Sequence, residues 1–156
     1  NRFPRLTSGI DVRIGYKGWE LFLCGTSQAG KWSFNDNTFW QMDGEDKYSV
    51  IALDRYHPEN NPAGHYPSLT TRAASNNFMN STFWLQNASF FRLKDAELSY
   101  TFDFLKAGVK KLRLFVRGTN LFVISADGHL DPETVNAGVT ASPLYQTLSG
   151  GASITI

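Results

Sequence analysis

The sequence lacks the features that most often identify an enzyme or a nucleic-acid-binding protein. Cys24 is the single cysteine, so neither an internal disulfide nor a cysteine-based metal cage can form. The 15 Lys and Arg residues are balanced by 14 Asp and Glu residues, which leaves no strongly basic surface for nucleic acid. No G-x-S-x-G, P-loop or dinucleotide-binding fingerprint is present. We therefore expect no catalytic residues, no metal site, no cofactor and no nucleic-acid partner.

Long hydrophobic runs are also missing, so the sequence predicts no transmembrane helix. This absence does not exclude a membrane protein, because the strands of a membrane barrel carry a much weaker, alternating signal. Aromatic residues, in contrast, are plentiful at 14% of the chain, and 13 glycines accompany them. This composition favours β-structure with wide loops.

A two-residue alternation of polar and apolar side chains marks the regular parts of the chain. From Glu97 onward, polar Glu97 and Ser99 alternate with apolar Leu98 and Tyr100, which is the period of a β-strand with one apolar face. Upstream the phase is reversed, and a β-bulge near residues 94–95 would restore one continuous apolar face. We predict strands at about 6–16, 19–29, 88–102, 110–122 and 144–156.

The connections between these segments alternate between short and long. Residues 17–18 form a tight turn and 103–109 a short one, with one helical turn as an option, whereas 30–87 and 123–143 are long loops. Within the first loop, 48–57 is compatible with a short helix that Pro58 would stop. If the strands run up and down, all short turns fall on one side, as in bacterial outer-membrane barrels. An 11-residue strand tilted by about 45° crosses about 26 Å, close to the apolar band of such barrels.

The charged residues of the strands are predicted to lie on one face, away from the apolar side chains. Candidates for the lumen of a barrel are Arg13, Glu97, Arg113 and Arg117. The two arginines of 110–122 could contact a plug or a substrate, or could be solvated lumen charges, and both interpretations stay open. Tyr16, Trp19, Tyr100 and Phe102 flank the short turns, where an aromatic girdle belongs.

Several stretches then resemble a known family. The segments FFRLKDAELSYTF, KKLRLFVRGTNLF, LDPE and YQTLSGGASITI resemble the C-terminal end of SusC/RagA-family TonB-dependent outer-membrane receptors of Bacteroidetes. The stretch LDRYHPENNPAGHYPSL resembles a loop of that family, with Tyr56-His57 where Trp-Thr is usual. The order and spacing of these pieces agree with the family, and the resemblance covers essentially the whole chain.

The resemblance implies that residues 1–156 are a C-terminal β-barrel segment of a larger receptor. The implied fold class is all-β, with about five antiparallel up-and-down strands from a large transmembrane β-barrel and long extracellular loops. It implies a place in the Gram-negative outer membrane, in contact with its lipid, and import of an oligosaccharide or peptide together with a SusD-like lipoprotein. TonB, ExbB and ExbD would supply energy through a part of the receptor that precedes this segment. A few strands cannot close a barrel, so we expect this segment alone not to transport anything.

Two alternatives remain open on the sequence alone. The aromatic residues of the first long loop could contact a substrate or the lipoprotein, or could pack the loop on itself. The candidates for contact are Trp32, Phe39, Trp40, Tyr56 and Tyr66. For the whole chain, the alternative function is a soluble all-β carbohydrate-binding or adhesion module, in which the apolar strand faces would pack together.

Overall fold

The computed structural model describes residues 3–42, 48–70, 76–106, 108–134, 142 and 144–156, with the backbone alone at 104–106. The chain divides into two units, each described by itself below. The sheet unit comprises Phe3–Lys31, Ala88–Ala126 and Leu144–Ile156. The loop unit comprises the described residues of Trp32–Asn87 and Asp127–Pro143.

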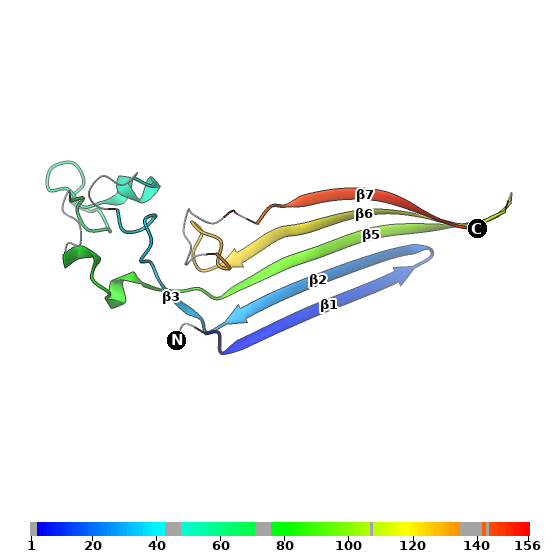
Figure 1. Cartoon of the computed structure of the whole chain (residues 1–156), viewed down its shortest axis with the longest axis horizontal. Helices are drawn as coiled ribbons and strands as arrows, with labels where there is room; N and C mark the ends of the chain where they lie inside the picture. The colour runs from blue at the N-terminus through cyan, green and yellow to red at the C-terminus, as the bar shows by residue number, and fades with distance from the viewer. Residues whose placement is uncertain (1–2, 43–47, 71–75, 107, 135–141, 143) are drawn as a thin grey trace. The chain divides into compact units, whose positions relative to one another are not determined.

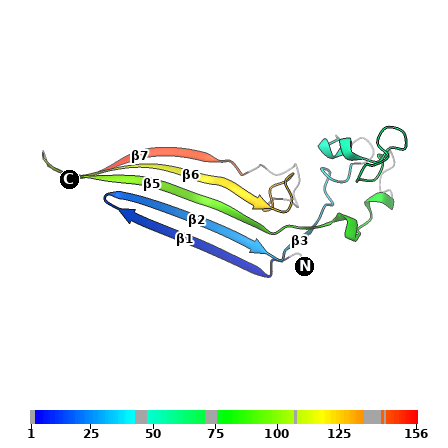
Figure 2. The same cartoon turned by 180° about the vertical axis from the view of Figure 1, so that it is seen from behind.

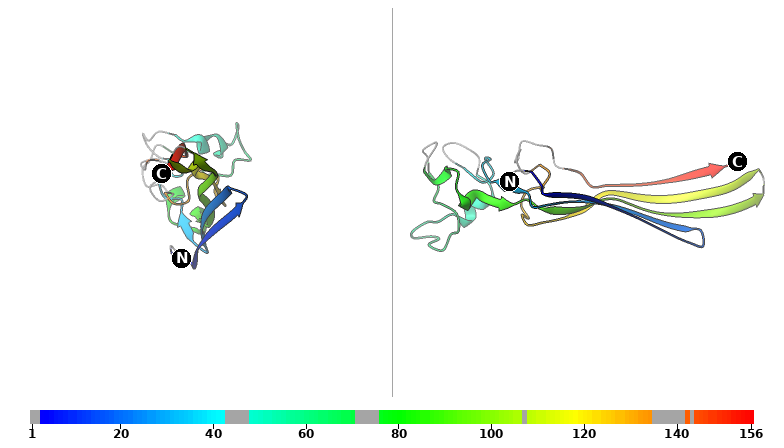
Figure 3. Two further views of the ribbon diagram at one scale, coloured as in Figure 1. Left: turned by 90° about the vertical axis from the view of Figure 1, so that its right-hand side faces the viewer. Right: turned by 90° about the horizontal axis from the view of Figure 1, so that it is seen from below.

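The sheet unit is a single antiparallel sheet of five long strands (Figure 1). Its strands lie in the order β1-β2-β5-β6-β7, so that each strand pairs with the next long strand along the chain. Figure 2 shows the same order from behind, and the right view of Figure 3 shows the β1–β2 hairpin diverging from β5, β6 and β7 toward its turn. The up-and-down antiparallel arrangement confirms the predicted fold class. The strand bounds are Leu6–Tyr16 (β1), Trp19–Ala29 (β2), Phe90–Lys106 (β5), Val109–Ser125 (β6) and Thr147–Thr155 (β7).

Two tight turns lie at one end of the sheet. Lys17 and Gly18 both have positive φ, 47° and 88°, which is the conformation of a two-residue type I′ hairpin turn. At the other turn, Lys106 pairs with Val109, and Gly108 has a φ of 79°. The short turn predicted at 103–109 is therefore longer than the turn in the structure. Both strands continue to a tighter turn, because glycine adopts the left-handed conformation without strain.

A bulge in β5 joins the two out-of-phase halves of this strand. The partners of Cys24 and Gly25 on β2 are Asp95 and Leu93, so that Lys94 is the extra residue. Opposite this bulge, β6 carries extra residues between Thr119 and Phe122. The predicted β-bulge near residues 94–95 is confirmed. Because the bulge shifts the register by one, the apolar side chains above and below it share one face of the sheet.

The loop unit has a small hydrophobic core of its own. Its buried members are Trp40, Met42, Ile51 and Trp84, and side chains from both predicted loops pack against them. The irregular connection expected at 30–87 thus contains packed structure. Its regular elements are β3 (Trp32–Phe34) paired with β4 (Leu85–Asn87), and the 3₁₀ helices η1 (Val50–Asp54), η2 (Asn76–Phe78) and η3 (Thr82–Trp84).

The helix considered for residues 48–57 is shorter than the sequence pattern allowed, and it is a 3₁₀ helix. The Ser49 side chain accepts a hydrogen bond from the backbone N–H of Ile51, which caps the first turn. The next residue after the helix, Arg55, is already extended, so the helix ends before Pro58 is reached. No helix in the described part of the chain is long and apolar enough to cross a membrane.

Candidate functional site

The strand register divides the side chains of the sheet unit into an apolar face and a polar face. Directly paired residues of antiparallel strands point to the same side. One register row therefore runs Ile14, Leu21, Leu98, Val116 across four strands, and its neighbour runs Tyr16, Trp19, Tyr100, Leu114. Most of these side chains are exposed, as are Leu148 and Ile154 on β7. The predicted amphipathic faces are present, and the apolar face is continuous across all five strands.

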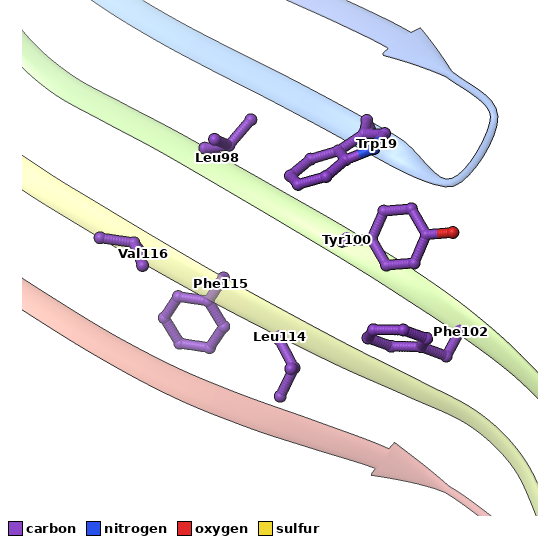
Figure 4. Close-up of a pocket in the computed structure, with 7 residues that line it drawn as sticks. All are labelled: Trp19, Leu98, Tyr100, Phe102, Leu114, Phe115 and Val116. Carbon is purple, nitrogen blue, oxygen red and sulfur yellow. The ribbon is translucent and has the colours of Figure 1, made fainter.

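Aromatic rings gather on the apolar face near the tight turns, where the sequence predicted a girdle. The ring centres of Trp19 and Tyr100 are 4.8 Å apart, and those of Tyr100 and Phe102 are 4.6 Å apart. These rings border a shallow hollow of about 650 Å³ (Figure 4). The residues that line it are Trp19, Leu98, Tyr100, Phe102, Leu114, Phe115 and Val116.

The polar face holds the four charged residues that were candidates for a lumen. Each of these residues has an oppositely charged partner on the same face. Arg113 pairs with Glu97, the Arg117 Nη2 atom lies 2.8 Å from Asp95 Oδ1, and Arg13 Nη1 lies 3.7 Å from Glu20 Oε1. Partly exposed pairs of this kind contribute at most about 1 kcal/mol each to stability. The pairs keep the face polar but nearly neutral.

The structure divides the aromatic candidates of the long loop into buried and exposed residues. Trp40 is only 2% exposed in the core of the loop unit, and Phe39 and Tyr66 pack against that core. For these three residues, packing of the loop on itself accounts for the aromatic side chain. Trp32 and Tyr56 are 42% and 46% exposed, so their rings stay available for a ligand or a partner.

Arg55 holds the loop unit together, and sequence reasoning missed it. Its side chain is buried, its guanidinium donates to the backbone carbonyl oxygens of Trp40 and Pro67, and it lies 5.4 Å and 5.9 Å from the ring centres of Tyr66 and Trp84. Burial lowers the pKa of the Arg55 guanidinium. Carbonyl dipoles and ring faces thus stabilise a cation that an ordinary surface arginine would expose to water. Nothing in the one-dimensional pattern around Arg55 distinguishes it from a solvated arginine.

The two predicted loops meet in the loop unit. The Gln86 side-chain amide donates to Asp127 Oδ2 at 3.0 Å, and the His129 ring lies 5.5 Å from the ring of Trp40. Leu130 packs against the same core. Residues from the second loop therefore complete a structure that the first loop begins, and the two loops present one surface.

A groove of about 400 Å³ lies on the loop unit beside Tyr56. The His57 Nδ1 atom accepts hydrogen bonds from the backbone N–H groups of Glu59 and Asn60, which fixes the turn at one edge of the groove. No group of three or more His, Cys, Asp or Glu side chains lies close enough to hold a metal ion among the residues that the structure describes. The groove is lined by Ala52, Leu53, Arg55, Tyr56, His57, Pro58, Asn60, Asn61, Ser68 and Leu69.

Comparison with known sequences gives a receptor as a relative. No family model matches the chain. The chain is 28% identical over 141 residues to a protein of Formosa agariphila named TonB-dependent receptor P26. The match covers 86% of this chain and 14% of that receptor, so the chain spans only a small part of the length of its relative.

Comparison with solved structures gives the same picture for the fold. The chain matches structures of the RagAB peptide importer in its closed-closed state, with a TM-score of 0.70 and 23% identity, and in its open-open state, with a TM-score of 0.62 and 24% identity. The matches cover 97% and 83% of this chain, and 17% and 14% of the matched chains. At these identities the likeness shows the fold. The chain is therefore similar in sequence to part of a TonB-dependent receptor and in fold to part of the RagAB importer structures.

Proposed function

We propose that the chain supplies five neighbouring strands and two outer loops to a TonB-dependent importer of nutrients in the outer membrane of a Gram-negative bacterium of the Bacteroidetes. The observation that supports this proposal is the continuous apolar face of the sheet unit. Side chains such as Ile14, Leu148 and Ile154 are more than half exposed, although they belong to the apolar set. Lipid would cover this face in a complete barrel, and the paired charges of the opposite face would line its interior.

This segment is not transport-competent by itself under the proposal. The outer edges of β1 and β7 are the two ends of the sheet order, and each would need another strand to satisfy its backbone groups in lipid. The rest of the receptor would supply those strands and the connection to TonB, ExbB and ExbD. The alternative, a soluble carbohydrate-binding or adhesion module, would need a second layer over the apolar face. Within the described sheet unit no such layer is present.

The substrate under this proposal is an oligosaccharide or a peptide, taken up together with a SusD-like lipoprotein. The matched structures are those of a peptide importer named RagAB, which favours a peptide over a glycan. In the loop unit, the exposed rings of Trp32 and Tyr56 are the residues that we propose for contact with the substrate or the lipoprotein. We propose transport and not catalysis as the activity of the complete receptor.

Cysteine labelling of the complete receptor in intact outer membranes tests the orientation of the sheet. Leu148 and Ser149 are adjacent on β7 and point to opposite faces, and both are exposed. In a background in which Cys24 and any other cysteine is serine, we expect Leu148→Cys to react only with a bilayer-soluble maleimide. Ser149→Cys should react with a water-soluble maleimide. Equal labelling of both positions by the water-soluble reagent would contradict a membrane barrel.

A further inference from the structure

The hollow on the apolar face has a chemistry that differs from the rest of this face. Most of the face presents aliphatic side chains, which suit any acyl chain equally. The hollow instead combines a floor of Leu98, Leu114 and Val116 with the clustered rings of Trp19 and Tyr100 (Figure 4). Its volume of about 650 Å³ is enough for much of one acyl chain.

The polar atoms of these rings are available to a ligand. Within the described part of the chain, the Tyr100 hydroxyl and the Trp19 indole N–H donate no hydrogen bond to another residue. In Figure 4 the Tyr100 hydroxyl points toward the end of the sheet at which the β1–β2 turn lies. Tyr and Trp have this amphipathic form at the level of lipid headgroups, where ester and phosphate oxygens accept hydrogen bonds.

Two exposed lysines lie beyond the rings at the same end of the sheet. The Lys17 Nζ atom lies 5.3 Å from the centre of the Tyr16 ring, which shares a register row with Trp19 on the apolar face. Lys110 has the same parity as Leu112 and therefore also belongs to the apolar face, where its Nζ atom donates a hydrogen bond to the Ile156 backbone oxygen at 3.4 Å. The carboxylates nearest in the register, Glu20 and Asp103, lie on the polar face. The rim of the hollow is thus cationic.

We propose that this hollow is a binding site for an anionic phospholipid. An acyl chain would lie against Leu98, Leu114 and Val116, and the ring donors would face the glycerol ester region. Lys17 and Lys110 would pair with the anionic headgroup, because charges of opposite sign attract at the membrane surface. The inference rests on the proposed function, since it requires this face of the sheet to lie in a bilayer.

The test uses the complete receptor, purified from outer membranes, delipidated in detergent and reloaded with phosphatidylglycerol or with diacylglycerol. Native mass spectrometry then measures the retained lipid. We expect the wild type to retain phosphatidylglycerol in preference to diacylglycerol, which has the same chains without the phosphate. Leu114→Trp, which fills the hollow, should abolish this retention, whereas Leu148→Trp, on the same face but outside the lining, should keep it.

The lysines are tested by Lys17→Asn and Lys110→Gln. Asparagine is chosen at residue 17 because it tolerates the positive φ of the turn. Each change should weaken phosphatidylglycerol retention by about fivefold, the effect expected of one lysine near an anionic lipid surface. Equal retention of the two lipids by the wild type, or unchanged retention in Leu114→Trp, would overturn the lipid site. A receptor absent from the outer membrane would instead overturn the proposed function.

Discussion

Gly64 lies directly against the backbone of Arg55 in the loop unit. A Cβ atom at residue 64 would come within 2.5 Å of the Arg55 carbonyl carbon and 2.6 Å of its oxygen. Beside this contact, the Tyr66 backbone carbonyl accepts a hydrogen bond from the Tyr56 N–H at 2.8 Å. The close approach of the two segments sets the position from which the Arg55 side chain reaches the core.

We expect Gly64→Ala to destabilise the loop unit strongly. The clash is with backbone atoms, so no side-chain rotation can relieve it, and overpacking of this kind costs typically about 1–3 kcal/mol. Hydrogen–deuterium exchange of the complete receptor should show faster exchange in 48–70. The matched control is Gly128→Ala, because a Cβ at residue 128 would meet no atom within 4 Å. Equal exchange in the two variants would show that the close approach is not required.

Replacing Arg55 by alanine should open the same unit. The change removes donors to two carbonyl groups and the cation over the rings of Tyr66 and Trp84, and it leaves a cavity. We expect a loss of about 2–4 kcal/mol in the stability of the loop unit. Limited proteolysis of the receptor should then cut within 32–87 faster than in wild type. His65→Ala, an exposed change in the same unit, is the control and should leave the cleavage rate unchanged.

The stability of the loop unit should fall in alkaline solution because of Tyr66. Burial, with a smaller contribution from the Asp54 carboxylate, raises the pKa of the Tyr66 phenol. The folded state therefore favours the protonated phenol. This stabilisation of the loop unit is fully present below the unfolded-state pKa of about 10, and it is lost as the pH rises through the higher pKa of the folded state. Tyr66→Phe removes the ionisable group. Hydrogen exchange measured on both sides of pH 10 should depend less on pH in Tyr66→Phe than in wild type, and an identical dependence would contradict the assignment.

The sheet could be predicted from the sequence because its signal is local. The bounds expected for the first two strands were 6–16 and 19–29, and the structure has Leu6–Tyr16 and Trp19–Ala29. Alternation and a turn glycine suffice here, since neither depends on distant residues. The end of β5 was missed because its continuation, 103–106, contains Asp103 and no clear alternation. Pairing with β6, a tertiary effect, extends this strand.

The loop unit could not be predicted in the same way. Its core joins Trp40, Trp84 and Leu130, which are far apart in the chain and follow no period. The sequence could therefore show an aromatic-rich loop but not which rings pack inside it. The burial of Trp40 favours packing inside the loop unit, whereas Trp32 and Tyr56 are exposed and stay candidates for contact.

Deleting Lys94 should leave the two faces of β5 in place. Lys94 is the extra residue of the β5 bulge, and the residues on either side of it already pair with consecutive residues of β2. Without Lys94 the strand alternates regularly, so Phe91 and Leu93 stay on the apolar face and the buried Arg92 stays on the polar face. The deletion therefore avoids placing an arginine on the lipid side, which costs up to about 2–4 kcal/mol at mid-bilayer depth and less near the interfaces.

Lys94→Ala keeps the number of residues in β5 unchanged and serves as the matched control for this deletion. We expect the Lys94→Ala receptor to reach the outer membrane in wild-type amounts and to show the gel shift on heating that a folded barrel gives. The deletion should give a similar amount of heat-shifting receptor, because its β5 still presents one apolar face to lipid. A several-fold lower amount in the deletion than in Lys94→Ala would show that the bulge does more than bring the two halves of β5 onto one face.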